Sequence, residues 1–172
     1  MDIAKKVAAT SGDPAEWNPP FCGDIDMAIR ADGSWWYLGT VIARPELVQL
    51  FARVLRCEAG RYFLVTPAEK VGIQVEDAPF VITDADILAT GSNDQSIQLS
   101  TNLGETFALD ADHALEIRGT AAHRRPYVHV RNNLWALLGR PVYYRLAAEV
   151  ESLPEPDDGY GVRSHGRWFR LL

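Results

Sequence analysis

Short apolar stretches separated by turn-forming residues constrain the fold of this chain more than any other feature of its sequence. In the second half they cover residues 80–88, 96–101, 106–110, 114–118 and 127–131, with turn signals such as Asn102-Leu103-Gly104 between them. Apolar runs of this length, bounded by Gly, Asn and Asp, are typical of strands joined by tight turns. We therefore expect a second half that is rich in strands.

The first half combines strands with one clear helix. Residues 25–30 alternate apolar and polar side chains, Asp32-Gly33 is a hairpin signal, and residues 35–38 supply an aromatic returning strand. Residues 45–55 place apolar side chains on one helical face behind Pro45, which favours an amphipathic helix. Two further strands are predicted at residues 62–66 and 71–76. The chain is therefore expected to have an α+β fold.

A similarity between two segments suggests an internal repeat that relates the two halves. Residues 41–50 align with residues 128–137, because each segment runs from a strand through an Arg into a Leu-x-x-Leu pattern. On this interpretation Asn132-Asn133 caps a helix that is interrupted at Gly139-Arg140-Pro141 and resumes over residues 142–150, with Pro141 in its first turn. The pattern favours duplicated strand-to-helix units. The alternative is that any strand leading into an amphipathic helix gives such a match.

The repeat would place an arginine, Arg44 or Arg131, at each of two helix starts. A cation there opposes the helix dipole by roughly 0.3–1 kcal/mol. Two explanations remain open at this point. A carboxylate of the protein pairs with each arginine, or an anionic ligand lies between the guanidinium and the free backbone N–H groups.

Charge is distributed unevenly along the chain. The 172 residues carry 17 Lys and Arg against 23 Asp and Glu, a net charge of −6 that argues against a general nucleic-acid coat. Residues 71–117 contain nine acids and no Lys or Arg, whereas residues 118–145 contain six Arg and no acid. This pattern fits charge pairing across one sheet, or a pocket in which a few of the Arg residues bind a phosphate-bearing ligand.

The sequence offers little support for catalysis, metal binding or export. Cys22 and Cys57 lack neighbours at metal-ligand spacing, and no phosphate-binding loop or dinucleotide fingerprint is present. We therefore assign no catalytic residue, metal or cofactor. No apolar segment has the length of a signal peptide or a membrane span, so a cytoplasmic location with no membrane partner is expected.

The chain resembles an uncharacterised bacterial family, domain of unknown function 1285, from Trp17 onward. The motifs that carry the resemblance are Trp17-Asn-Pro-Pro, Cys22-Gly-Asp-Ile-Asp-Met, Asp32-Gly-Ser-Trp-Trp-Tyr-Leu-Gly39, Arg44 with Leu47-Val48 and Leu50-Phe51, Leu64-Val-Thr-Pro-Ala-Glu-Lys70, Glu76-Asp-Ala-Pro-Phe80, Pro126-Tyr-Val-His-Val-Arg131 and Ser164-x-Gly166. The match departs from the expected pattern at Thr40-Val41, at Ala68 and at Arg170-Leu171.

This resemblance implies two small, duplicated α+β domains, which we place at residues 1–78 and 79–172. The second would be similar to a pleckstrin-homology barrel with a closing helix. The resemblance also implies a site at the domain interface for a nucleotide-like ligand, and a role in signal transduction.

Our first hypothesis is a regulatory protein that binds a phosphate-bearing small molecule between its halves. The ligand would stack on Trp35 or Tyr37, and Arg44, Lys70 and Arg131 would hold it. The full set of predicted ligand-binding residues is Trp17, Asp26, Trp35, Tyr37, Arg44, Thr66, Glu69, Lys70, Tyr127 and Arg131. The alternatives are a hydrolase with Asp26 or Glu69 as base, and a protein-interaction module without a small ligand.

Overall fold

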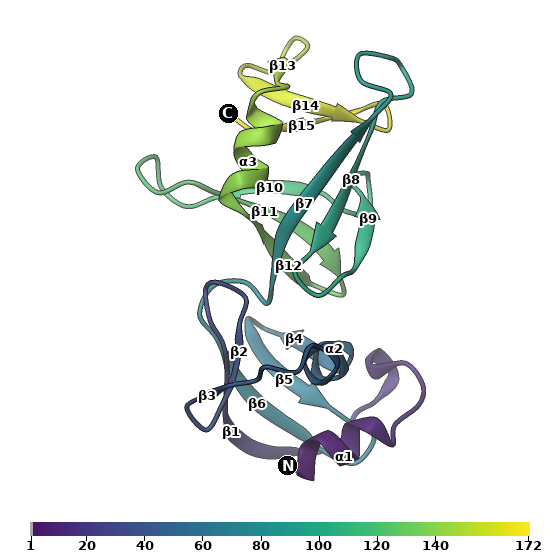
Figure 1. Ribbon diagram of the computed structural model, residues 1–172, viewed down its shortest axis with the longest axis vertical. Coiled ribbons are helices and arrows are strands. Elements are labelled where there is room, and N and C mark those ends of the chain that lie inside the picture. The colour runs from purple at the N-terminus through teal and green to yellow at the C-terminus, as the bar shows by residue number, and fades with distance from the viewer. Residues whose placement is uncertain (1) are drawn as a thin grey trace. The chain divides into compact units, whose positions relative to one another are not determined.

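The computed structural model describes residues 2–172, which divide into two compact units. The first unit contains the described residues up to Pro79 together with Asn132–Leu134, and the second contains Phe80–Arg131 and Trp135–Leu172. The first unit combines one sheet with short helices, and the second combines two sheets with one described helix (Figure 1). The predicted α+β class is confirmed.

A six-stranded sheet forms the framework of the first unit, in the order β3-β2-β1-β6-β5-β4. Its central strands β1 and β6 run parallel, and the other neighbours are antiparallel. The strands are β1 (Phe21–Ile29), β2 (Trp35–Tyr37), β3 (Thr40–Val41), β4 (Leu55–Glu58), β5 (Arg61–Val65) and β6 (Lys70–Val75). The helices are α1 (Asp2–Ala8), the 3-10 helix η1 (Pro14–Glu16) and α2 (Pro45–Arg53).

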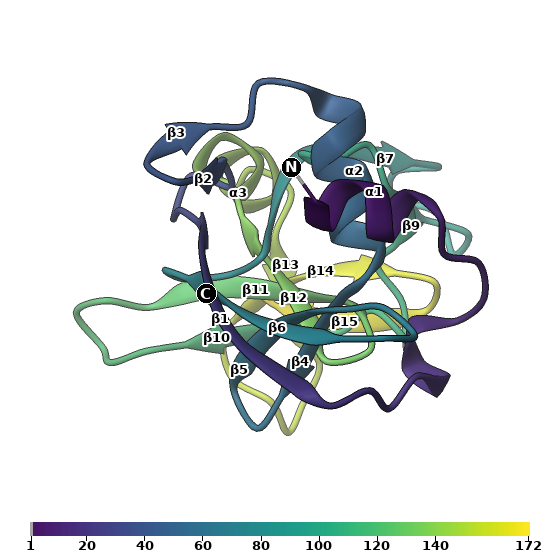
Figure 2. The same ribbon diagram turned by 90° about the horizontal axis from the view of Figure 1, so that it is seen from below.

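Helix α2 covers one face of this sheet and closes its core. Pro45 occupies the first turn, and Val48 and Phe51 are buried against the sheet. Trp35 of β2 is 1% exposed, and its ring stacks on Phe51 with centroids 6.2 Å apart. Figure 2 shows α1 on the same side of the sheet as α2. The predicted amphipathic helix and the predicted Asp32-Gly33 hairpin are both confirmed.

The second unit contains another six-stranded sheet, in the order β10-β11-β12-β7-β8-β9. Its central strands β7 and β12 also run parallel. Its strands are β7 (Phe80–Leu88), β8 (Ser96–Thr101), β9 (Thr106–Ala108), β10 (Leu115–Arg118), β11 (Arg125–Arg131) and β12 (Leu134–Leu138). The two sheets therefore share one topology, because the first and last strands of each sheet pair in its centre.

Three short strands follow the only helix described in the second unit, α3 (Arg140–Ala147), which packs against β7. They form a separate sheet, β13 (Glu151–Ser152), β14 (Tyr160–Ser164) and β15 (Arg167–Arg170). The predicted closing hairpin at Ser164-His165-Gly166 is confirmed as the turn between β14 and β15. The predicted pleckstrin-homology-like barrel with a closing helix is not confirmed. One sheet forms a curled half-barrel, and three strands follow α3, so this helix does not end the unit.

The helix predicted after Asn132-Asn133 is wrong. Both asparagines have a positive φ, 44° and 60°, which makes them the two-residue turn of a hairpin between β11 and β12. Leu134, Ala136 and Leu138 are buried in alternation, as a strand requires. The proposed match between residues 41–50 and 128–137 therefore pairs a helix with a strand and is no structural repeat.

Candidate functional site

The turn that joins β5 to β6 is organised by Thr66. The Thr66 side chain is 2% exposed, and its Oγ1 accepts a hydrogen bond from the backbone N–H of Glu69 at 3.2 Å. The backbone N–H of Thr66 in turn donates to the carbonyl of Glu69 at 2.9 Å. The geometry thus gives Thr66 a role in shaping the turn that presents Glu69 and Lys70.

Both charged residues of this turn have partners within the first unit. Lys70 Nζ donates to Glu58 Oε2 at 2.8 Å and lies 4.9 Å from the centre of the Phe63 ring. Glu69 Oε2 accepts a hydrogen bond from Lys6 Nζ at 3.1 Å. The Lys70 hydrogen bond is the main cause that lowers the pKa of the Glu58 carboxyl below its ordinary value. An anion at Lys70 would therefore compete with a carboxylate of the protein.

Trp17 belongs to a segment that Arg56 holds in place. Arg56 Nη2 donates to the backbone carbonyl of Trp17 at 2.8 Å and also to the carbonyl of Pro14. The Trp17 side chain is half-buried. These contacts explain why the residues before Pro19-Pro20 have a fixed course beside β4.

Three more predicted residues lie on the hairpin of β1 and β2. Asp26 is exposed, Tyr37 is half-buried, and Trp35 is buried in the core. Trp35 Nε1 is a buried donor without a hydrogen-bond partner among the described residues. A ligand that stacked on Trp35 would have to displace Phe51, so in this conformation Trp35 supports the fold rather than a binding surface.

Arg44 lies at a helix start, as predicted. It is exposed and is the N-cap residue of α2, with no side-chain hydrogen bond to the cap and with Glu46 in the first turn. Because a carboxylate near a helix N-terminus interacts favourably with the dipole, Glu46 offsets part of the unfavourable charge of Arg44.

Arg131 does not lie at a helix start, since it precedes the hairpin turn described above. Its Nη2 pairs with Glu105 Oε1 at 3.1 Å, and its guanidinium lies 5.2 Å from the centre of the Phe80 ring. Tyr127 is 9% exposed and carries the Arg118 guanidinium over its ring at 5.1 Å. The predicted residues thus divide into eight in the first unit and two, Tyr127 and Arg131, in the second. The domain-interface site stays a prediction.

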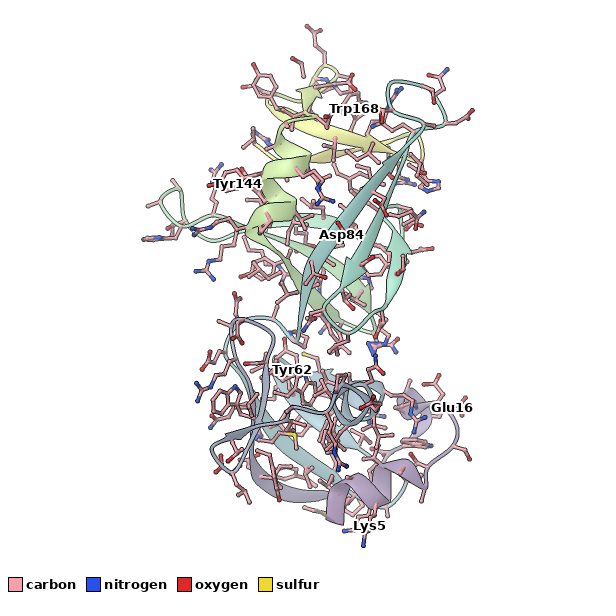
Figure 3. The ribbon with its side chains drawn as sticks, in the orientation of Figure 1. Lys5, Glu16, Tyr62, Asp84, Tyr144 and Trp168 are labelled. Carbon is pink, nitrogen blue, oxygen red and sulfur yellow. The ribbon has the colours of Figure 1, made fainter. Side chains whose placement is uncertain are left out.

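The six arginines of the basic block divide into two groups of three. Arg118, Arg131 and Arg145 pair with Glu116, Glu105 and Asp84, all from the acidic block. Figure 3 labels Asp84 on β7, next to α3. Charge pairing therefore explains these three arginines. The phosphate pocket stays a prediction for Arg124, Arg125 and Arg140.

Arg124, Arg125 and Arg140 line a groove of about 1120 Å³ in the second unit, together with Arg170 of β15. We call it the arginine groove. Its walls come from the β10–β11 hairpin, from the start of α3 and from the end of β15. Among the described residues that line it, none carries a carboxylate side chain. Four cations therefore converge on one cavity whose described lining has no acidic side chain, and Arg170 Nε donates to a main-chain oxygen of Leu172 at 3.4 Å.

Arg140 occupies the helix-start position that the sequence predicts for Arg131. It is the first residue of α3, whose N-cap is Gly139 and whose first turn has no acidic residue within the described chain. The sequence predicts a helix over residues 142–150 with Pro141 in its first turn, and α3 forms there with Pro141 as its second residue. The all-arginine composition of residues 118–145 is the sequence signal that pointed to this region.

No group of three His, Cys, Asp or Glu side chains in the described part of the chain is placed to hold a metal ion. No helix among residues 2–172 has the length and apolar character needed to cross a membrane.

Matches to known protein families decide the family of this chain. Residues 14–78 match "Domain of unknown function (DUF1285), N-terminal domain", and residues 79–171 match "Protein of unknown function (DUF1285), C-terminal domain". The chain belongs to the DUF1285 family. No curated protein matches it.

Two solved DUF1285 structures are similar to this chain. A family member from Silicibacter pomeroyi DSS-3 has 41% identity and a TM-score of 0.85, with 96% of this chain and 92% of that chain covered. A family member from Shewanella baltica OS155 has 33% identity and a TM-score of 0.59, with 74% and 94% covered. These DUF1285 structures share the fold, and their descriptions give no activity.

Proposed function

We propose that this protein binds a phosphate-bearing small molecule in the arginine groove of its second unit. The observation that carries the proposal is the convergence of Arg124, Arg125, Arg140 and Arg170 on a cavity with no Asp or Glu side chain in its described lining. Guanidinium groups match the geometry of phosphate oxygens and form charge-assisted hydrogen bonds with them. An anion in the groove would relieve the mutual repulsion of these four side chains.

The position of Arg140 supports this proposal. A cation in the first turn of a helix is unfavourable unless an anion is nearby, and α3 supplies no acid there within the described chain. The ion pairs of the basic block also support it. Arg118, Arg131 and Arg145 have carboxylate partners, whereas no ion pair joins Arg124 or Arg140 to a described acid.

We propose binding rather than hydrolysis. The described lining has no Asp or Glu side chain, so the groove lacks the carboxylate side chain that the hydrolase hypothesis requires. The bases that hypothesis named, Asp26 and Glu69, both belong to the first unit. The signalling role implied by the family resemblance would follow if ligand binding changed the affinity of the protein for a partner protein.

We also infer that the two units arose by duplication of one six-stranded sheet. The support is topological, because each sheet pairs its first strand in parallel with its last. Such a duplication has its equivalent starts at Phe21 and Phe80. It differs from the strand-to-helix repeat suggested by the sequence.

Thermal stabilisation tests the proposed function. A ligand that binds the folded state at a hundredfold excess over its Kd adds about 2.7 kcal/mol to the free energy of unfolding. Inorganic phosphate, pyrophosphate and adenosine mono-, di- and triphosphate are the probes. We expect a shift in Tm with at least one phosphate compound, and Arg140→Ala should abolish it.

Arg167→Ala is the matched control. It removes an identical charge from β15 but does not line the groove, so it should keep the shift. If no phosphate compound raises Tm, or if Arg140→Ala and Arg167→Ala weaken the shift equally, the proposed function is wrong.

A further inference from the structure

We infer that the arginine groove is selective for a nucleoside di- or triphosphate, whose base stacks on Tyr144 and whose phosphates contact the arginines. This inference rests on the proposed function and adds to it the chemistry of the ligand's body. A nucleoside polyphosphate combines the two features that the groove offers together, namely several anionic groups and a flat aromatic ring.

Arg140 and Tyr144 lie four residues apart on α3, and both line the groove. Side chains at this spacing are neighbours on one face of a helix, with Cβ atoms about 5–6 Å apart. The guanidinium that binds a phosphate and the ring that stacks a base are thus separated by one helical turn. A ribose joins base to phosphate over a comparable span.

Tyr144 is suited to stacking because its ring is accessible. Tyr144 is 63% exposed, and among the large apolar side chains of the described residues only Leu38 is more exposed. Tyr143 contacts the ring in an edge-on geometry, with centroids 5.7 Å apart and planes at 71°. Figure 3 shows Tyr144 extending from α3 on the side on which the β10–β11 hairpin projects. Edge-on packing by Tyr143 steadies the ring and leaves its surface available to a base.

The other arginines fit a ligand with more than one phosphate. Arg124 and Arg125 come from the β10–β11 hairpin, whereas Arg170 comes from the end of β15. These cations thus approach the groove from walls other than that of Arg140. Its volume of about 1120 Å³ exceeds the usual upper limit of about 1,000 Å³ for small-molecule sites, so a complete nucleoside triphosphate can be accommodated.

Isothermal titration with ADP and with pyrophosphate tests this inference, because the two probes share a diphosphate and differ in the nucleoside. The unmodified protein should bind ADP at least about tenfold more tightly than pyrophosphate, since stacking of one base on an aromatic side chain has that effect. Tyr144→Ala should remove this preference by weakening ADP binding alone. Tyr144→Phe should retain it.

Tyr160→Ala is the control, because Tyr160 is a comparably exposed tyrosine of the same unit that does not line the groove. It should leave both affinities unchanged. Equal affinity for ADP and pyrophosphate, or equal weakening of both by Tyr144→Ala, would overturn the inference while the proposed function stands. Failure of both probes to bind would overturn the proposed function as well.

Discussion

The Trp35 ring is a structural element of the first core. It is 1% exposed and stacks on Phe51 at an interplanar angle of 17°. Trp35→Ala should lower the free energy of unfolding by about 3–5 kcal/mol, because it leaves a large cavity beside α2. Urea unfolding followed by circular dichroism measures this loss. A loss below about 1 kcal/mol would show that Trp35 is not a core residue.

The pair of Lys70 and Glu58 makes stability depend on pH. The Lys70 hydrogen bond holds the pKa of Glu58 below its ordinary value of 4.5. A carboxyl whose pKa is lowered by folding stabilises the folded state above its unfolded pKa, and this contribution is lost as the pH falls through the folded pKa. Glu58→Gln should therefore destabilise the protein at pH 7, and the difference from the unmodified protein should shrink below pH 4.5.

Urea unfolding at pH 7 and at pH 3 measures that difference. Glu151→Gln is the control, since Glu151 is exposed and no ion pair is described for it. A Glu58→Gln difference that is equal at both pH values would mean that the Lys70 hydrogen bond does not lower the pKa of Glu58.

At the residue scale, the sequence identified the chemistry of the basic block but not the positions that use it. The predicted ligand residues Lys70 and Arg131 have carboxylate partners, Glu58 and Glu105, which are not their neighbours in sequence. Arg140 was not predicted, because its role depends on a helix start and on the hairpin that faces it. Such long-range placement is set by sheet pairing, which local patterns do not encode.

At the element scale, the turn at Asn132-Asn133 allows β11 and β12 to pair as neighbouring strands of the second sheet. Both residues adopt the left-handed conformation, which asparagine tolerates and β-branched residues avoid. Asn133→Val should therefore cost about 1–2 kcal/mol of stability, whereas Asn133→Gly should be close to neutral. Urea unfolding of both variants measures this. Equal stability of the valine and glycine variants would contradict the hairpin.

The reason for the wrong helix is an ambiguity in the pattern itself. Asn132-Asn133 suits either a helix cap or a two-residue hairpin turn. Leu134, Leu137 and Leu138 match a helical spacing, and Leu134, Ala136 and Leu138 match a strand equally well. Parallel pairing of β12 with β7 selects the strand. By contrast, Asp32-Gly33 and residues 45–55 have one interpretation each, and both elements formed as predicted.

At the scale of the whole molecule, a net charge of −6 coexists with a strongly cationic cavity. Within the basic block, Arg118, Arg131 and Arg145 form ion pairs with described acids, and Arg124, Arg125 and Arg140 line the groove. On the proposed function, the groove attracts phosphate locally although the chain as a whole is acidic.

Isothermal titration of two double variants with ADP tests the central claim most directly. Arg124→Ala with Arg140→Ala removes two cations of the arginine groove, and Arg44→Ala with Arg131→Ala removes two cations of the site predicted from the sequence. Loss of one charge-assisted hydrogen bond weakens binding by about tenfold to a hundredfold. We expect the first variant to lose ADP binding and the second to keep the affinity of the unmodified protein. Retained binding by the first variant, with loss in the second, would contradict the account.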